Sequence, residues 1–366
     1  MRSLVIGGTG PTGHFLVNGL RARGHEVAIF HSGRHEVAEI PGDVEHIHAD
    51  PFDPAAFAAA LGPRTFDVCI ASYGRLRRIA EAMVGRCGRF LSVGGAPAYR
   101  GYMNPWLFSP PGLPVPTRED AELVARESDD EKGFRIVRTE EAVFSHHPRA
   151  THFRYPTVYG PYQPLPIEWC IVRRALDRRP WLVLPDGGLT LSHRAYAENA
   201  AFALLLAVDR PDQTCGEIFH CGDEEVLSLR QIAEIAARSL GHCFEIVSMP
   251  WELAVPARPL LAQPSPSHRV FDLSKLRRKL GYRDAVPARE ALARTARWLA
   301  AHPPAPGGIE ETVLQDPFDY AAEDALVGAW KSALAALPEV RFAREPGYTM
   351  SYSGPGGRPR SQADFE

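Results

Sequence analysis

The clearest indication of a chemical function comes from three glycines near the N-terminus, Gly7, Gly10 and Gly13. They follow an apolar run, Leu4–Ile6, and precede apolar residues at helical spacing, which predicts a buried strand, a tight turn and a helix start. In such a turn the first glycine permits the bend, the second lets the backbone approach a pyrophosphate, and the third lets helix and strand pack closely. The helix N-terminus adds N–H groups and partial positive charge. The stretch therefore predicts a dinucleotide-binding site.

A second group with possible chemistry is a set of histidines, His31, His35, His46 and His48, near the ends of two predicted strands. His46 and His48 share one strand face, so a metal site is geometrically possible. No cysteine or carboxylate set stands at ligand spacing beside them in the sequence. We therefore interpret these residues as ribose-contacting or surface histidines and expect no metal.

The elements that must position these residues alternate along the first part of the chain. Strands are predicted at 4–6, 26–30, 44–48, 66–71 and 89–93, with helices after the glycine turn, at 54–61 and at about 79–85. This alternation predicts an α/β, Rossmann-type fold, a doubly wound parallel sheet with helices on both faces. We expect a dinucleotide-binding domain over residues 1–160, to which the chain returns at about 190–222. A smaller α/β substrate lobe should occupy most of 161–300. A C-terminal extension, 301–366, should hold one helix and an irregular tail.

Composition limits the classes of partner. The 366 residues are 45% hydrophobic and carry a formal charge of −3, which gives no electrostatic reason to expect nucleic acid or an anionic membrane. The six cysteines include no C-x-x-C pair and are interpreted as free thiols of a reducing compartment. Neither a signal peptide nor a membrane-spanning run is predicted. We expect a cytoplasmic protein that binds a small-molecule substrate, with a homodimer as one compatible assembly.

Five motifs, taken in chain order, resemble the extended short-chain dehydrogenase/reductases, the NAD-dependent epimerase/dehydratase superfamily. They are Val5–Gly13, His48–Asp50, Tyr155–Pro161, Gly216–Asp223 and Phe271–Tyr282. Together they span about residues 1–300, so the resemblance is specific at the level of the superfamily. It gives little information about the substrate. It implies the Rossmann fold, a nicotinamide dinucleotide and a redox or epimerising activity.

The resemblance also implies which residues contact the cofactor. Asp50 should approach the adenine, and the end of the second strand, Phe30–Arg34, should meet the 2′ position of the adenosine ribose. No Asp or Glu occurs from 27 to 35, whereas Ser32 and Arg34 can bind a phosphate, so we expect NADP, with NAD as the alternative. The expected cofactor contacts are Gly7, Thr9, Gly10, Pro11, Thr12, Gly13, His31, Ser32, Arg34, Asp50, Pro51, Ala71, Ser72, Tyr73, Ser92 and Tyr155.

The catalytic positions of the family are occupied by other residue types in this chain. The family uses a Ser or Thr after the fifth strand, then a Tyr that transfers the proton, and a Lys four residues later that lowers the tyrosine pKa. Here Lys132 stands where the Tyr belongs, Ile136 where the Lys belongs, and the serine position falls within 93–95. No Tyr lies between 103 and 154. The resemblance therefore implies an atypical member.

Three explanations are compatible with this pattern. The acid could be relocated to Tyr99, Tyr102 or Lys132, or supplied by a phenol of the substrate. The protein could instead bind the dinucleotide without redox turnover, as a sensor or scaffold. It could also be RNA-associated, as some relatives of the superfamily are, although the balanced charge speaks against this. We favour the first, an NAD(P)-dependent oxidoreductase or epimerase-like enzyme acting on a hydroxyl or carbonyl of a small organic or sugar-like substrate.

Two further features bear on the substrate. The segment 94–119 is rich in Gly, Pro and aromatic residues, and it is too long for a simple connector, so we expect it over the ligand crevice. The pairs His193-Arg194 and His268-Arg269 fall at second-lobe positions that meet the substrate in sugar-nucleotide relatives of the family. The resemblance implies that Arg269 could bind a diphosphate, and a structural ion pair is the competing interpretation.

Overall fold

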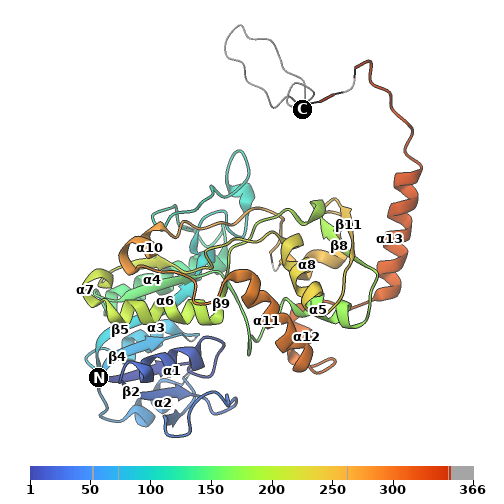
Figure 1. The fold of residues 1–366 in the computed structure, drawn as a ribbon. Helices are drawn as coiled ribbons and strands as arrows, with labels where there is room; N and C mark the ends of the chain where they lie inside the picture. The colour runs from blue at the N-terminus through green and yellow to red at the C-terminus, as the bar shows by residue number, and fades with distance from the viewer. Residues whose placement is uncertain (52, 73, 262, 345, 348–366) are drawn as a thin grey trace, which may run out of the picture. The chain divides into compact units, whose positions relative to one another are not determined.

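The main sheet of the protein has seven parallel strands (Figure 1). The structure is a computed structural model that describes residues 1–51, 53–72, 74–261, 263–344 and 346–347. The strands follow the order β10 (Ile218–His220), β6 (Thr151–Tyr155), β5 (Cys87–Gly95), β4 (Phe66–Ala71), β1 (Arg2–Ile6), β2 (Glu26–His31) and β3 (Glu45–His48). In chain order, β2 and β3 are added on one side of β1, and β4, β5 and β6 are then added on its other side. The α/β, doubly wound fold predicted from the sequence is confirmed. Its ligand crevice is expected beside β1 and β4, where the order reverses.

Helices cover both faces of this sheet because strand side chains alternate between two apolar cores. Val5 belongs to one core, whereas Leu4 and Ile6 belong to the other. The first face is covered by α1 (Gly13–Ala22) and α6 (Ala197–Asp209), and the second by α2 (Pro54–Leu61), α3 (Leu76–Ala82) and α4 (Glu131–His146).

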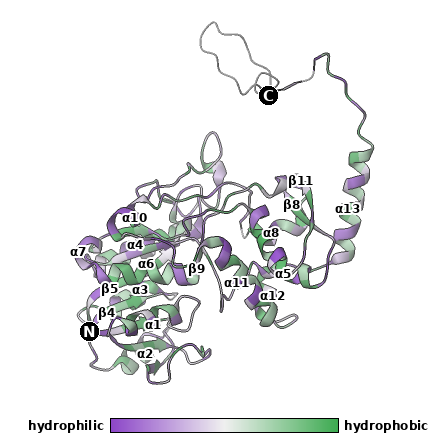
Figure 2. Cartoon of the chain, in the orientation of Figure 1, coloured by the Kyte–Doolittle hydropathy of each residue, from purple (hydrophilic) through white to green (hydrophobic). Residues whose placement is uncertain are grey.

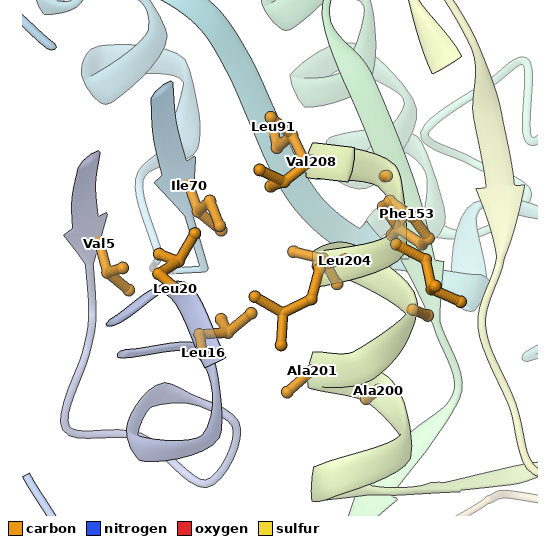
Figure 3. Close-up of a cluster of buried hydrophobic side chains, with 14 of the residues drawn as sticks. Val5, Leu16, Leu20, Ile70, Leu91, Phe153, Ala200, Ala201, Leu204 and Val208 are labelled. Atoms are coloured by element: carbon orange, nitrogen blue, oxygen red, sulfur yellow. The ribbon is translucent and has the colours of Figure 1, made fainter. Parts of the chain in front are cut away.

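The core under α1 and α6 joins the chain's return segment to the first strands. Figure 3 shows Leu16 and Leu20 of α1 facing Leu204 of α6, with strand residues such as Ile70 behind them. A side-chain Cβ at Gly19 would lie 2.2 Å from Leu205 Cδ1, so a larger residue there would require the Leu205 side chain to shift. Most residues of α6 are buried, and its ribbon is largely coloured as hydrophobic in Figure 2.

The smaller lobe contains a parallel pair, β8 (Trp181–Pro185) with β11 (Glu245–Met249), and the helices α5 (Trp169–Leu176), α8 (Leu229–Ser239) and α11 (Ala288–Ala301). A second pair, β7 (Thr157–Tyr159) with β9 (Arg194–Tyr196), connects the lobe to the main sheet. The short helices are α7 (Pro211–Thr214), α9 (Arg258–Leu261), α10 (Ser274–Leu280) and the 3₁₀ turns Ala96–Ala98, Pro105–Leu107, Asp186–Gly188 and Val255–Ala257. The sequence did not predict β8, whose apolar run is only Trp181–Leu184.

The C-terminal region differs from the expected extension in its number of helices. The chain divides into the units Met1–Pro317 and Phe318–Glu366. The first holds α12 (Ile309–Leu314), followed by a buried ion pair between Asp316 and Arg174 of α5, with an Nη1–Oδ2 distance of 2.6 Å. The second holds α13 (Tyr320–Ala335), the helix that the sequence predicted. The predicted irregular tail lies, from residue 348 on, outside the described residues.

Two expectations from composition can be compared with the structure. All six cysteines are free, and Cys69, Cys170 and Cys221 are buried. No helix in the described part of the chain is long and apolar enough to cross a bilayer.

Candidate dinucleotide-binding and active site

The glycine turn connects β1 to α1 at the carboxyl edge of the sheet. Gly7 has a φ of +89°, a conformation that favours glycine, and its N–H donates to the carbonyl of Phe30 in β2 at 2.9 Å. Gly10 N–H donates to the Gly7 carbonyl at 3.2 Å, and Gly13 N–H to the Gly10 carbonyl at 2.9 Å. The turn is therefore fixed by the backbone alone, and it leads directly into the N-terminus of α1.

The glycines serve different purposes in this turn. A Cβ at Gly13 would lie 2.0 Å from the Gly8 carbonyl oxygen, so the fold itself requires glycine there. A Cβ at Gly10 would meet only the Gly7 carbonyl oxygen, at an ordinary 3.5 Å. The fold does not need glycine at position 10. An open, side-chain-free backbone beside a helix N-terminus is what an approaching pyrophosphate requires.

Other predicted cofactor residues follow the neighbouring strands. His31 ends β2 and Ala71 ends β4, while Ser72 N–H donates to the Ile6 carbonyl at 3.1 Å. Beyond β2, Ser32 is half-buried and Arg34 exposed. Around the turn, Thr9 and Pro11 are half-buried and Thr12 is buried; beyond β3, Asp50 is exposed and Pro51 buried. Tyr73 lies outside the described residues. The topology thus brings these segments to the same edge of the sheet, and their contacts with a dinucleotide remain predictions.

Ser92 and Tyr155, also predicted cofactor contacts, are occupied by protein partners. The Ser92 hydroxyl is fully buried and hydrogen-bonds to His152 Nδ1 at 2.8 Å, because the two residues are opposite each other in β5 and β6. Tyr155 is buried, and its hydroxyl lies 3.4 Å from the Ala200 carbonyl oxygen. Neither side chain is open to a ligand in this structure.

The three candidate acids have very different surroundings. Lys132 is exposed in the first turn of α4, and Ile136 is half-buried one turn later. Tyr99 and Tyr102 are 0% and 2% exposed, respectively. A proton donor must come within hydrogen-bond reach of its substrate. Of these three side chains, Lys132 alone is exposed to solvent in this structure.

The Tyr99 hydroxyl belongs to a buried polar network. It accepts a hydrogen bond from Arg154 Nη1 at 2.6 Å and lies 2.5 Å from His220 Nε2. Arg154 is in turn paired with Glu140 of α4, with Nε–Oε2 and Nη2–Oε1 distances of 3.0 and 2.5 Å. The network ties α4, β6 and β10 to the segment that carries Tyr99.

Burial sets the protonation states in this network. It lowers the pKa of His220 to about 3, so the ring is neutral at pH 7. His220 Nδ1 lies 3.1 Å from the Asp272 carbonyl oxygen, which requires the proton on Nδ1 and leaves Nε2 to accept from Tyr99. Burial also raises the pKa of Tyr99, although the Arg154 cation opposes it. Tyr99 is therefore held as a neutral phenol, a positioning element more than an activated acid.

Tyr102, which belongs to the segment 94–119, packs against Phe271 and Arg269. The Tyr102 ring stacks on Phe271 with an interplanar angle of 5°, and Arg269 lies over the Tyr102 ring at 5.2 Å. Arg269 is 1% exposed, and its Nη2 has no hydrogen-bond partner within the described chain. Arg194, in contrast, is paired with the Glu168 carboxylate.

Sequence reasoning missed Glu140, His152, Arg154 and His220, the buried polar residues of this region. Arg154 stands in the otherwise buried strand β6, and a buried charge needs a partner. That signal was present in the sequence. The identity of the partner was not, because Glu140 lies on a different element.

Solved structures with the same architecture were found by structural comparison. One is UDP-glucose 4-epimerase with UDP-glucose from Thermotoga maritima, with a TM-score of 0.67 and 17% identity over 82% of this chain and 99% of that chain. Another is UDP-glucuronic acid 4-epimerase from Bacillus cereus in complex with UDP-glucuronic acid and NAD, with a TM-score of 0.63 and 16% identity over 82% and 100%.

This chain therefore has the fold of these nucleotide-sugar epimerases. The family resemblance predicted from the five motifs is thereby confirmed at the level of the fold. No family model matches the chain.

Curated proteins that resemble this chain in sequence have diverse functions. A 3-diazoavenalumate denitrifying reductase from a Streptomyces species is 28% identical over 66% of this chain and 82% of that protein. A UDP-N-acetyl-α-D-glucosaminuronate decarboxylase from Bacillus cytotoxicus is 24% identical over 81% and 97%. The chloroplast stem-loop binding protein of 41 kDa b from Arabidopsis thaliana is 24% identical over 65% of this chain and 63% of that protein.

Proposed function

We propose that this protein is a nicotinamide-dinucleotide-dependent enzyme that oxidises, reduces or epimerises a hydroxyl or carbonyl centre of a small organic or sugar-like substrate. The observation that carries the proposal is Gly10, where the fold leaves a backbone open beside the N-terminus of α1 and does not itself require glycine. The turn containing Gly7 and Gly10 would hold the pyrophosphate. The nicotinamide, when bound, supplies the hydride donor or acceptor.

The cofactor preference is revised from the expectation based on Ser32 and Arg34. Several structural neighbours, including a dTDP-glucose 4,6-dehydratase from Bacillus anthracis, are complexes with NAD. Arg34 is exposed, and NADP would require it to turn toward the ribose. We therefore place NAD first and NADP second.

Arg269 supports a substrate that carries a phosphate. A buried guanidinium is costly unless its donors are bonded. Arg269 Nε donates to the Tyr102 carbonyl and Nη1 to those of Ser265 and Ser267, which leaves Nη2 as its donor without a partner among the residues that the structure describes. A phosphate oxygen would satisfy Nη2 with a charge-assisted hydrogen bond, and because Arg269 is 1% exposed this contact requires the residues that cover it to move. The sugar nucleotides named in several neighbouring structures have this chemistry.

Lys132 is the acid–base residue that we favour for this chain. It is exposed at the position where the family places its tyrosine, whereas Tyr99 and Tyr102 are enclosed by protein. A lysine ammonium can donate a proton to a developing alkoxide and recover it in the reverse direction. The alternative, a dinucleotide-binding scaffold without turnover, is favoured by Ile136, because no ammonium replaces the family's lysine there. The stem-loop-binding relative suggests a nucleic-acid partner, against which the formal charge of −3 argues.

The dinucleotide site is tested by fluorescence titration of NADH and NADPH against the wild type and a Gly10→Val variant. We expect the valine to weaken binding at least tenfold, about 1.4 kcal/mol, because its side chain occupies the space of the pyrophosphate. Gly42→Val is the matched control, since a Cβ at Gly42 meets nothing within 4 Å. Unchanged binding in Gly10→Val would show that the dinucleotide does not bind at this glycine turn.

The enzymatic assignment needs a second measurement. The wild type is incubated with NADH or NADPH and a panel of carbonyl compounds and keto-sugar nucleotides, and nucleotide oxidation is followed at 340 nm. UDP-sugars are examined in parallel for epimerisation by NMR. Tight dinucleotide binding without any turnover across both panels would favour the scaffold.

A further inference from the structure

Three histidines and one glutamate meet beside the glycine turn, on the outer strands of the sheet. His31 is the last residue of β2, and His46 and His48 lie on one face of β3, in the strand register that pairs His31 with His48. Glu36 comes from the loop after β2. One ligand atom from each of the four residues lies within 4.8 Å of all the others. No ligand spacing in the sequence indicates Glu36, because the folding of the loop after β2 brings it to the histidines.

The separations between these atoms match the edges of a small metal tetrahedron. Zinc–nitrogen bonds of 2.0–2.1 Å in tetrahedral geometry require ligand–ligand distances of about 3.3 Å. His31 Nε2 lies 3.0 Å from His46 Nδ1 and 3.1 Å from His48 Nε2. The Glu36 carboxylate lies at similar separations from the same nitrogens: its Oε1 is 3.8 Å from His31 and 3.6 Å from His48, and its Oε2 is 3.4 Å from His46.

Hydrogen bonding among these side chains cannot satisfy all of them. His31 Nε2 faces two other imidazole nitrogens at hydrogen-bond distance, yet it can carry only one proton or one lone pair. Burial lowers the pKa of His31, and the neighbouring histidines lower it further against the opposing Glu36, so its ring is neutral at pH 7. A neutral imidazole is the form that ligates a metal.

The charge and exposure of the set also suit a cation. The Glu36 carboxylate supplies one negative charge, and its side chain and that of His48 are each 53% exposed, which gives an ion a path from solvent. Ligation through His31 Nε2 places a proton on Nδ1, so the long 3.3 Å contact from Gly33 N–H to Nδ1 would be given up. That contact is the one adjustment that ligation demands of the surroundings of His31.

We propose that His31, Glu36, His46 and His48 bind one divalent transition-metal ion of the Zn²⁺ class in tetrahedral N₃O geometry. Three imidazoles with a carboxylate, and no thiolate, are typical ligands of such an ion. The ion fixes the loop that follows β2. Because Gly7 donates to the carbonyl of Phe30, immediately before His31, the metal would also stiffen the wall of the glycine turn.

The test uses the untagged full-length protein, since a histidine tag would itself bind the probe. The protein is treated with a chelator, desalted and titrated with Co²⁺, which absorbs strongly in the visible range when it is tetrahedral. We expect saturation at one Co²⁺ per chain, displacement by Zn²⁺, and a rise in the melting temperature with Zn²⁺.

Variants connect the signal to the proposed ligands. His48→Ala and Glu36→Gln change exposed side chains, and each should weaken Co²⁺ binding by at least about tenfold, since even the loss of a residue that supports a ligand costs 10–100-fold. His35→Ala is the matched control, because His35 is exposed in the same loop but is outside the four-residue set. Absence of the tetrahedral band, or equal affinity in all three variants, would overturn the proposal. The readout does not involve the dinucleotide, so it is independent of the proposed function.

Discussion

The guanidinium of Arg154 and the carboxylate of Glu140 form a two-point ion pair inside the protein, with N–O distances of 3.0 and 2.5 Å. Arg154 is 1% exposed and Glu140 is 5% exposed, so water screens neither charge effectively. Arg154 also donates to the Tyr99 hydroxyl at 2.6 Å and to the Glu119 carbonyl at 2.9 Å. The pair therefore holds α4 and β6 against the segment that would cover the ligand crevice.

Removal of the carboxylate from this pair should destabilise the fold strongly. Glu140→Ala leaves a buried, uncompensated guanidinium, and we expect a loss of about 3–5 kcal/mol in the free energy of unfolding. Glu141→Ala is the matched control in the same helix, because Glu141 is exposed and pairs with Arg138 at the surface, where such a pair contributes about 0–1 kcal/mol. Urea denaturation of both variants gives the comparison. Similar losses in the two variants would contradict the assignment of Glu140 as a buried structural partner.

Once a substrate has been found, variants of Lys132 and Tyr99 should differ in whether they lower kcat or the stability of the fold. Lys132→Ala removes an exposed side chain, so we expect kcat to fall by about 10²–10⁴-fold, with little change in the melting temperature. Tyr99→Phe removes a hydroxyl that is bonded to Arg154 and His220, so we expect a loss of about 1–3 kcal/mol in stability and a change in kcat of less than about tenfold.

Lys132→Arg distinguishes proton transfer from simple electrostatic attraction. Arginine keeps the positive charge but does not release its proton at physiological pH. If Lys132 is a general acid–base, Lys132→Arg should remain as inactive as Lys132→Ala. If Lys132 only binds an anionic group, Lys132→Arg should recover activity because its KM returns toward that of the wild type. If Tyr99→Phe, and not Lys132→Ala, abolished turnover while the protein stayed folded, the acid would have to be assigned to Tyr99.

The sequence predicted the elements with clear local signals and missed the contacts that depend on tertiary structure. The helix α2 has the predicted bounds, Pro54–Leu61, because a capping Asp53, a first-turn proline and an apolar run all agree. Strand β8 was missed because its short apolar run has no periodicity to distinguish it from a loop. Glu36 meets three histidines only through the path of a loop, and no local pattern encodes that meeting. For the same reason, the burial of Tyr99 could not be inferred from its place in an aromatic-rich segment.

Asp223 should make stability depend on pH in a defined direction. Its carboxylate is 2% exposed and accepts from Tyr196 N–H, Asn199 Nδ2 and the Tyr159 hydroxyl. Burial raises its pKa from 3.8 to about 7, and these hydrogen bonds oppose the rise only in part. The folded state thus binds a proton that the unfolded state releases. The associated stability is fully present below pH 4 and is lost as the pH rises toward 7, by at most about 4 kcal/mol.

An Asp223→Asn variant isolates this contribution. The amide can keep its neighbours, because its oxygen accepts from Tyr196 and Asn199 while its Nδ2 donates to the Tyr159 hydroxyl, which lies 3.3 Å from the Ala288 carbonyl oxygen and can donate there. We expect the free energy of unfolding of the wild type, minus that of the variant, to fall between pH 4 and pH 7 and to stay level above about pH 8. Asp43→Asn, at a side chain that is 69% exposed, is the control and should give a difference that is nearly independent of pH. A constant difference for Asp223→Asn would mean that the buried carboxyl remains ionised across this range, with its three donors outweighing the cost of burial.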